Sequence, residues 1–197
     1  MKNRKTTLRK IILSAVMLAA MYSNANNGLS NNPKNENKTT FSIKDVKSGN
    51  QLLIKDLNGI ILYKEYIKDS GDYSKGFDLT ALPNGSYVFE LEKDLEIKFY
   101  PFTVESNKVL FSENETTIHK PYVTAKGNYL YVSKLALNNE PLDIKIYYKD
   151  TSELIYSEKI KDTKSIQKVY KLSSNYKGDY TIVLNSNGRE YYEYITL

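Results

Sequence analysis

The chain of 197 residues has no cysteine and no tryptophan, and its one histidine is His119. Without cysteine, disulfides, thiol catalysis and cysteine-based zinc sites are excluded. A lone histidine has no second imidazole with which to hold a metal. We expect His119 to be a solvated residue in a link between modules, and we expect neither a metal nor a cofactor.

Motifs for a serine nucleophile and for phosphate binding are also missing, because no Gly-x-Ser-x-Gly or Gly-rich phosphate loop occurs. The carboxylates Asp56, Asp69, Glu90 and Glu92 mostly alternate with apolar residues, which is typical of the wet face of a sheet. A calcium site at Asp69–Asp72 stays open because this segment is oxygen-rich, although it lacks the EF-hand loop pattern. We predict that the protein is not an enzyme. A carboxylate-dependent hydrolase stays open, since its two carboxylates leave no sequence motif.

Long apolar runs are limited to one near the start, Ile11–Met21, which follows five basic residues. Small residues then precede a cleavage site between Ala25 and Asn26, as in a secretory signal peptide. The apolar run is too short to span a bilayer, which needs about 20 residues. We therefore predict an exported protein, periplasmic or extracellular, with no transmembrane anchor after cleavage.

The formal net charge of +5 comes entirely from this leader. The chain has 28 Lys+Arg and 23 Asp+Glu, and residues 1–25 hold five of the basic residues and no acidic one. The remainder is therefore neutral overall. A basic footprint for nucleic acid is absent, so we expect no nucleic-acid partner.

An internal repeat organises the rest of the chain. A shift of 93 residues aligns Leu53–Val104 with Ile146–Leu197 without a gap, and it places Gly85 on Gly178 and Tyr87 on Tyr180. Each copy alternates apolar and polar residues in short runs that end at turn residues such as Asn84-Gly85. Tyr87 and Tyr180 could each form a tyrosine corner or be ordinary core residues.

This pattern predicts an all-β fold, with two tandem immunoglobulin-like β-sandwich modules after the signal peptide. The strands expected in the first copy are 51–55, 60–67, 76–79, 86–92 and 97–104. In the second copy they are 129–132, 144–148, 154–160, 169–172, 180–184 and 190–197. The expected domains are a signal peptide (1–25), a disordered Asn-rich spacer (26–39), module 1 (40–111), a linker (112–120) and module 2 (121–197). Lys108–Phe111 could belong to either module.

The stretch Phe77–Tyr87 resembles a recurrent Asp-Leu-x-x-Leu-Pro-x-Gly-x-Tyr turn of secreted Bacteroidota β-sandwich proteins. It is similar to the type A C-terminal sorting domain of the type IX secretion system, and the whole of 40–197 resembles secreted two-module proteins of unassigned function. The resemblance implies the sandwich fold and secretion. A sorting or adaptor role is an alternative, although the second copy has Asn175-Tyr176 in place of Leu-Pro and the C-terminus lacks the expected lysine.

Tyrosine, with 18 residues, offers the best hint of a binding site. Tyr129 and Tyr131 share one face of an expected strand, and Tyr192 and Tyr194 share one face of the last strand. Such rows either stabilise a sheet through cross-strand pairs or stack on a ligand. We predict a non-catalytic protein that binds a protein or glycan partner, or serves a structural role, with these four tyrosines as candidate binding residues.

Overall fold

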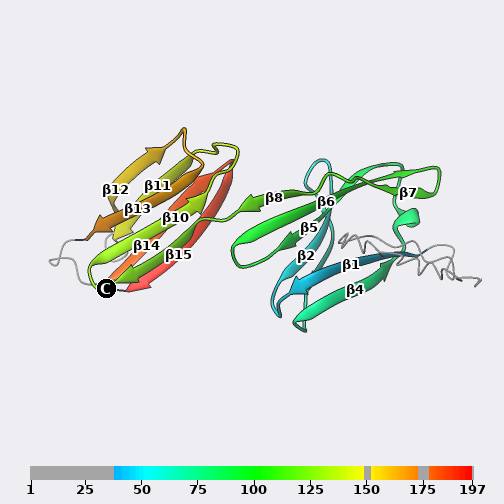
Figure 1. Ribbon diagram of the computed structural model, residues 1–197, viewed down its shortest axis with the longest axis horizontal. Coiled ribbons are helices and arrows are strands. Elements are labelled where there is room, and N and C mark those ends of the chain that lie inside the picture. The colour runs from blue at the N-terminus through cyan, green and yellow to red at the C-terminus, as the bar shows by residue number, and fades with distance from the viewer. Residues whose placement is uncertain (1–37, 149–151, 173–177, 197) are drawn as a thin grey trace, which may run out of the picture.

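The computed structural model describes residues 38–148, 152–172 and 178–196 (Figure 1). The predicted signal peptide, with its cleavage site at Ala25 and Asn26, and nearly all of the predicted spacer lie outside these residues, as do Asn175 and Tyr176. In the described part, no helix is long and apolar enough to cross a membrane. The all-β prediction is confirmed, because all the sheets are antiparallel and the helical element found is a short 3-10 turn, η1 (Leu79–Ala81).

Module 1 is built from two packed sheets. The smaller sheet pairs β1 (Thr39–Val46) with β4 (Gly71–Phe77). The larger sheet has the order β3-β2-β5-β6-β7. β7 pairs with the second half of β6, and β8 pairs with the first half of β6 on the same side. Its strands are β2 (Gln51–Asp56), β3 (Ile61–Tyr66), β5 (Gly85–Glu92), β6 (Glu96–Glu105), β7 (Lys108–Phe111) and β8 (Thr116–His119).

Module 2 has three strands packed on four. The orders are β13-β10-β9 and β12-β11-β14-β15. The strands are β9 (Tyr122–Lys126), β10 (Tyr129–Leu135), β11 (Leu142–Tyr148), β12 (Glu153–Ile160), β13 (Ser165–Lys171), β14 (Asp179–Ser186) and β15 (Arg189–Thr196). In chain order from β9, these sheets correspond to strands A-B-E and C-C′-F-G of an immunoglobulin-like sandwich.

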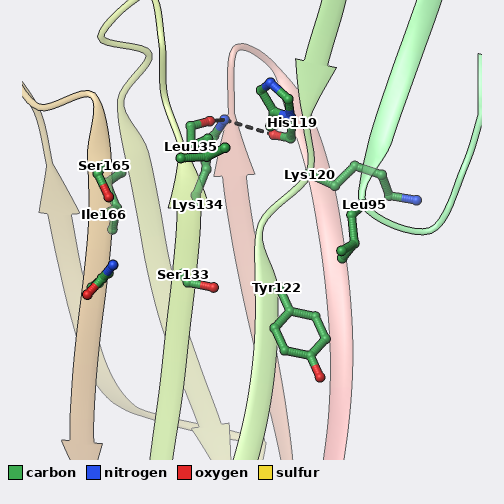
Figure 2. A pocket seen from close by; sticks show the side chains of 10 residues that line it. Leu95, His119, Lys120, Tyr122, Ser133, Lys134, Leu135, Ser165 and Ile166 are labelled. Atoms are coloured by element: carbon green, nitrogen blue, oxygen red, sulfur yellow. Dashed lines mark hydrogen bonds between the residues drawn. The ribbon is translucent and has the colours of Figure 1, made fainter.

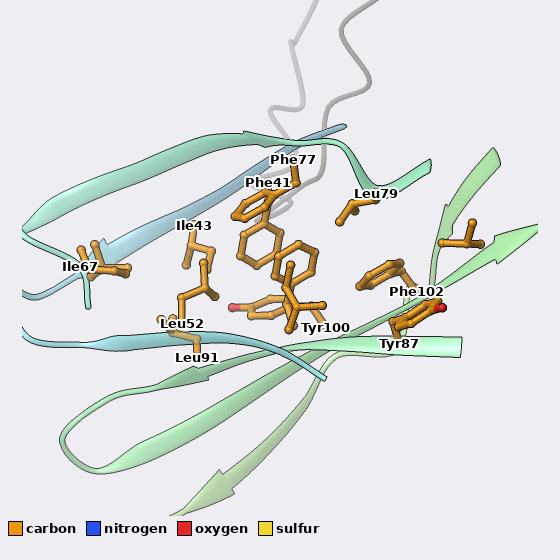
Figure 3. Close-up of a cluster of buried hydrophobic side chains, with 14 residues drawn as sticks. Phe41, Ile43, Leu52, Ile67, Phe77, Leu79, Tyr87, Leu91, Tyr100 and Phe102 are labelled. Atoms are coloured by element: carbon orange, nitrogen blue, oxygen red, sulfur yellow. The ribbon is translucent and has the colours of Figure 1, made fainter. Parts of the chain in front are cut away.

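Each module has its own apolar core, which forms because inward and outward residues alternate along the strands. In module 1, aromatic side chains fill the space between the sheets (Figure 3). The rings of Phe41 and Phe89 stack with their centroids 4.0 Å apart. In module 2 the core is mainly aliphatic, with Tyr180 as its largest buried side chain. Separate cores explain why two copies of one pattern fold as two sandwiches.

The strand pairing corrects the ungapped repeat. Phe89 in β5 corresponds to Ile182 in β14 at an offset of 93, but their partners Ile54 and Ile146 are 92 residues apart. A constant shift would place the outward-facing Leu53 on the inward-facing Ile146. Since a slip of one residue reverses every side chain of a strand, the second copy must have one residue more between the paired residues of β11 and β12 than the first copy has between those of β2 and β3.

The first strand of each copy is shifted further. Phe77 pairs with Thr39 in the first copy, and its equivalent Tyr170 pairs with Leu130 in the second, so these partners are 91 residues apart. By this offset Lys134 in β10 takes the place of Ile43, a core residue of module 1. Lys134 is itself buried. The repeat therefore identifies a lysine at a core position.

Four sequence predictions on local structure need correction. β4 begins at Gly71 and β13 at Ser165, well before the predicted strands 76–79 and 169–172. Asn84-Gly85 is no positive-φ turn, since neither residue has a positive φ and η1 makes the connection instead. The predicted linker contains β8, which pairs with β6.

The open alternatives on Lys108–Phe111 and Tyr87 are resolved by their contacts. Lys108–Phe111 forms β7, which extends the larger sheet of module 1. The Tyr87 hydroxyl donates to the Pro83 carbonyl oxygen at 2.7 Å, as in a tyrosine corner. Tyr180 is fully buried, and residues 173–177 lie outside the described part of the chain.

Candidate binding face on the second module

The four predicted tyrosines lie on opposite sides of module 2. Tyr129 and Tyr131 point outward from the three-stranded sheet, because their neighbours Leu130 and Val132 point into the core. Tyr192 and Tyr194 point outward from the four-stranded sheet on β15. The structure therefore separates the candidates into two pairs.

The outer face of the three-stranded sheet gathers the first pair with further exposed apolar residues. We call this surface the tyrosine face. Its outward residues are Tyr122, Thr124 and Lys126 on β9, Tyr129, Tyr131, Ser133 and Leu135 on β10, and Ser165, Gln167, Val169 and Lys171 on β13. Five of them are large hydrophobic residues that remain well exposed: Tyr122, Tyr129, Tyr131, Leu135 and Val169.

Cross-strand register arranges this surface in rows. Tyr131 lies between Thr124 and Val169, and Ser133 lies between Tyr122 and Gln167. Directly opposite residues have Cβ atoms about 4.5–5.5 Å apart, so each row presents neighbouring side chains. The aromatic rings are thus interleaved with neutral hydrogen-bonding groups.

Sequence reasoning named Tyr129 and Tyr131 but missed Tyr122 and Val169. The alternation of outward Tyr122, Thr124 and Lys126 with inward Val123 and Ala125 was available as a signal for β9. β9 joins β10 through the local hairpin at Gly127-Asn128, whereas the pairing of β10 with β13, which adds Val169, is long-range and alternation does not specify it.

The second tyrosine pair has a different setting. The Tyr192 hydroxyl donates to Glu190 Oε2 at 2.6 Å, and this hydrogen bond and the adjacent negative charge raise the pKa of Tyr192. On the same outer face, Lys159 pairs with Asp143 at 3.0 Å. Polar groups on this side of the module therefore largely satisfy one another.

At the junction with module 1, the tyrosine face leads into a groove of about 330 Å³ (Figure 2). Leu95 and His119 line it from module 1, and Tyr122 and Leu135 line it from module 2. Behind it, the Lys134 ammonium donates to the carbonyl oxygens of His119 at 2.9 Å and Leu135 at 3.1 Å. Burial lowers the pKa of Lys134, against a smaller opposing effect of Glu140. His119 is half-buried on β8 rather than solvated in a loop.

The same junction holds a buried ion pair. Glu90, predicted to line a wet face, is only 2% exposed. Its two carboxylate oxygens accept hydrogen bonds from the two terminal nitrogens of Arg189, at 3.1 and 3.2 Å. Lys55 donates to Glu90 at 2.7 Å, and the Arg189 guanidinium lies 5.4 Å from the Phe99 ring centroid. The prediction for Glu90 fails because module 2 covers this outer face of module 1.

A polar cluster recurs in both copies between the edge strands of the two sheets. In module 2, Glu158 accepts hydrogen bonds from Lys168 at 2.6 Å and Tyr170 at 2.7 Å. In module 1, Glu65 accepts hydrogen bonds from Lys75, Tyr63 and Tyr73.

These carboxylates are held as anions. Burial of the Glu65 carboxylate raises its pKa, but the hydrogen bonds and the Lys75 charge outweigh burial and lower it overall. Among the described residues, no group of three or more His, Asp or Glu side chains could hold a metal ion.

Comparisons with known proteins give distant likenesses only. No protein-family model and no curated protein matches the chain. Among solved structures, a biofilm-associated protein BSP domain is 10% identical over 82% of this chain and 27% of its own, with a TM-score of 0.29. The chicken CNTN1 FN1–FN3 domains are 11% identical over 82% of this chain and 61% of their own, with a TM-score of 0.27.

A third structure, native alpha-2-macroglobulin from Escherichia coli spanning domains MG0-NIE-MG1, is 13% identical over 86% of this chain and 70% of its own, with a TM-score of 0.23. The present chain thus spans about a quarter of the first structure and about three fifths of the second. The chain is an all-β protein that resembles these structures distantly.

Proposed function

We propose that this chain is a non-catalytic binding protein of the cell exterior and that the tyrosine face is its interaction surface. The observation that carries the proposal is the gathering of five exposed large hydrophobic residues on one sheet. Contiguous exposed apolar patches typically mark interaction sites in soluble proteins. Tyrosine also combines a ring that packs with a hydroxyl that forms hydrogen bonds.

The surroundings of the patch support the same use. The junction groove adjoins it through Tyr122 and Leu135, which belong to both surfaces. A ligand that follows β10 could therefore lie on the sheet and enter the groove. The partner expected from the sequence, a protein or a glycan, is compatible with this shape.

The export predicted from residues 1–25 places such a protein in the periplasm or outside the cell. In that setting, extended polysaccharides and the surfaces of other proteins are the available macromolecular ligands.

The proposal can be tested with the purified chain without residues 1–25. Binding to a glycan array and to purified envelope proteins would be compared between wild type, Tyr131→Ala and Tyr194→Ala. Truncation of a central aromatic anchor costs about 2 kcal/mol or more, so Tyr131→Ala should weaken binding at least about thirtyfold.

Tyr194→Ala is the matched control, because Tyr194 is an exposed tyrosine of the same module on the opposite face. It should bind as wild type does. Equal binding by wild type and Tyr131→Ala, or loss of binding in Tyr194→Ala alone, would refute the proposal.

A further inference from the structure

The tyrosine face carries charge of one sign only. Its eleven outward residues include Lys126 and Lys171 and no aspartate or glutamate. Outside residues 1–25, the chain has equal numbers of basic and acidic residues, so a carboxylate-free sheet face departs from the average. The opposite face of the same module carries Asp143 and Glu190 beside its lysines.

The two lysines flank one aromatic ring. Tyr129 in β10 is directly opposite Lys126 in β9 and directly opposite Lys171 in β13. All three side chains point outward and are exposed. Within the described part of the chain, neither lysine forms an ion pair, so both ammonium groups are available to an anionic ligand.

Beyond this row the face becomes neutral. Tyr131 lies in the next row, and Ser133 lies in the row after it, with Tyr122 and Gln167 beside it. Successive rows are about 7 Å apart, since a strand rises about 3.4 Å per residue. A ligand along β10 would therefore meet a cationic row first, and then aromatic rings, hydroxyls and an amide.

We propose that the tyrosine face binds an acidic polysaccharide, with a carboxylate or sulfate group between Lys126 and Lys171. This inference rests on the proposed function and names its ligand class. The apolar faces of the sugar rings pack on Tyr129 and Tyr131, and the sugar hydroxyls meet Ser133 and Gln167.

The position of β10 favours a sugar chain over a peptide. β10 pairs with β9 on one side and β13 on the other, so its backbone N–H and C=O groups are already used. A peptide that adds as a strand needs unpaired backbone groups at a sheet edge. On this face recognition has to come from side chains, and a rigid, hydroxyl-rich chain suits the groups present.

The test uses the chain without residues 1–25 in calorimetric titrations with five probes. Alginate supplies carboxylates on sugar rings, heparin supplies sulfates, and dextran is a neutral glycan. Poly-L-glutamate and oligo(dT) are anions without a polysaccharide backbone. We expect saturable binding to alginate or heparin that weakens as salt rises from 50 to 300 mM, because salt screens exposed charges.

The double variant Lys126→Glu/Lys171→Glu should bind the preferred polysaccharide at least about tenfold more weakly. The matched control is Lys108→Glu/Lys145→Glu, which makes the same charge change at exposed lysines away from the tyrosine face. The control should bind as wild type does. Thermal melts of both variants verify that they fold.

The outcomes separate the two proposals. Dextran binding that depends on Tyr131 but not on the lysines would overturn the acidic ligand and leave the binding face intact. Tightest binding to poly-L-glutamate or oligo(dT), or no binding to alginate and heparin, would also overturn the inference. Polysaccharide binding unaffected by Tyr131→Ala would overturn both proposals.

Discussion

Removing the Glu90 carboxylate should destabilise the protein by acting on the joint between its modules. In Glu90→Gln, the charges of Arg189 and Lys55 lose their counter-ion at a nearly inaccessible site, since the side chain of Glu90 is 3% exposed. Breaking a buried ion pair typically costs about 3–5 kcal/mol. The Arg189 side chain is 35% exposed and can recover hydration, so we expect about 2–3 kcal/mol.

For a protein of this length, such a loss lowers the midpoint of thermal unfolding by about 4–12 °C. Circular dichroism or calorimetry measures it, and a double-mutant cycle with Arg189→Ala isolates the pairwise coupling. Asp94→Asn is the control, because it breaks the solvent-exposed Lys47–Asp94 pair and should leave the midpoint nearly unchanged. An unchanged midpoint in Glu90→Gln, or strictly additive effects in the cycle, would refute the reasoning.

The effect of this substitution should depend on pH in a defined direction. Burial raises the pKa of Glu90, but Arg189 and Lys55 outweigh burial, so the pKa in the folded protein is lowered. A carboxyl group whose pKa is lower in the folded than in the unfolded protein contributes its full stabilisation only above the unfolded-state pKa of about 4.3. The difference between wild type and Glu90→Gln should therefore persist at neutral pH and shrink as pH falls below that value.

Two further predictions concern the junction and the first core. Burial lowers the pKa of Lys134, so wild type should gain stability relative to Lys134→Met as the pH rises toward about 10.4, the pKa of lysine in the unfolded chain. Thermal melts of both proteins from pH 7 to 10.5 would show this gain. A stability difference that stays constant with pH would argue against a buried ammonium. Tyr87→Phe removes the hydrogen bond to Pro83 and should cost about 0.5–1.5 kcal/mol in urea unfolding, whereas no loss would show that the corner is dispensable.

Sequence alternation was sufficient to predict the bounds of a strand where that strand has one apolar and one polar face. β5, β6, β11 and β14 lie close to their predicted bounds, because inward apolar residues alternate with mostly polar ones. β4 was found only at its end, since its first six residues are polar or exposed and only Phe77 is buried. Its extent is determined by pairing with β1, which local sequence does not contain.

Long-range contacts also explain the errors at the junction. Glu90 alternates with the core residues Phe89 and Leu91, so its outward direction was predictable. Its burial was not, because the partner Arg189 is 99 residues away in the chain. Likewise, the sequence placed Tyr129 and Tyr131 on one face correctly, but their distance from Tyr192 and Tyr194 follows only from which strands share a sheet.

The most direct test of the account is to map a bound ligand on the protein by NMR. Amide shifts of the ¹⁵N-labelled chain without residues 1–25 would be followed during titration with alginate oligosaccharides. We expect saturable changes confined to β9, β10, β13 and the junction groove, centred on Tyr129 and Tyr131. Changes centred on β15 around Tyr192 and Tyr194, or no changes at all, would contradict it.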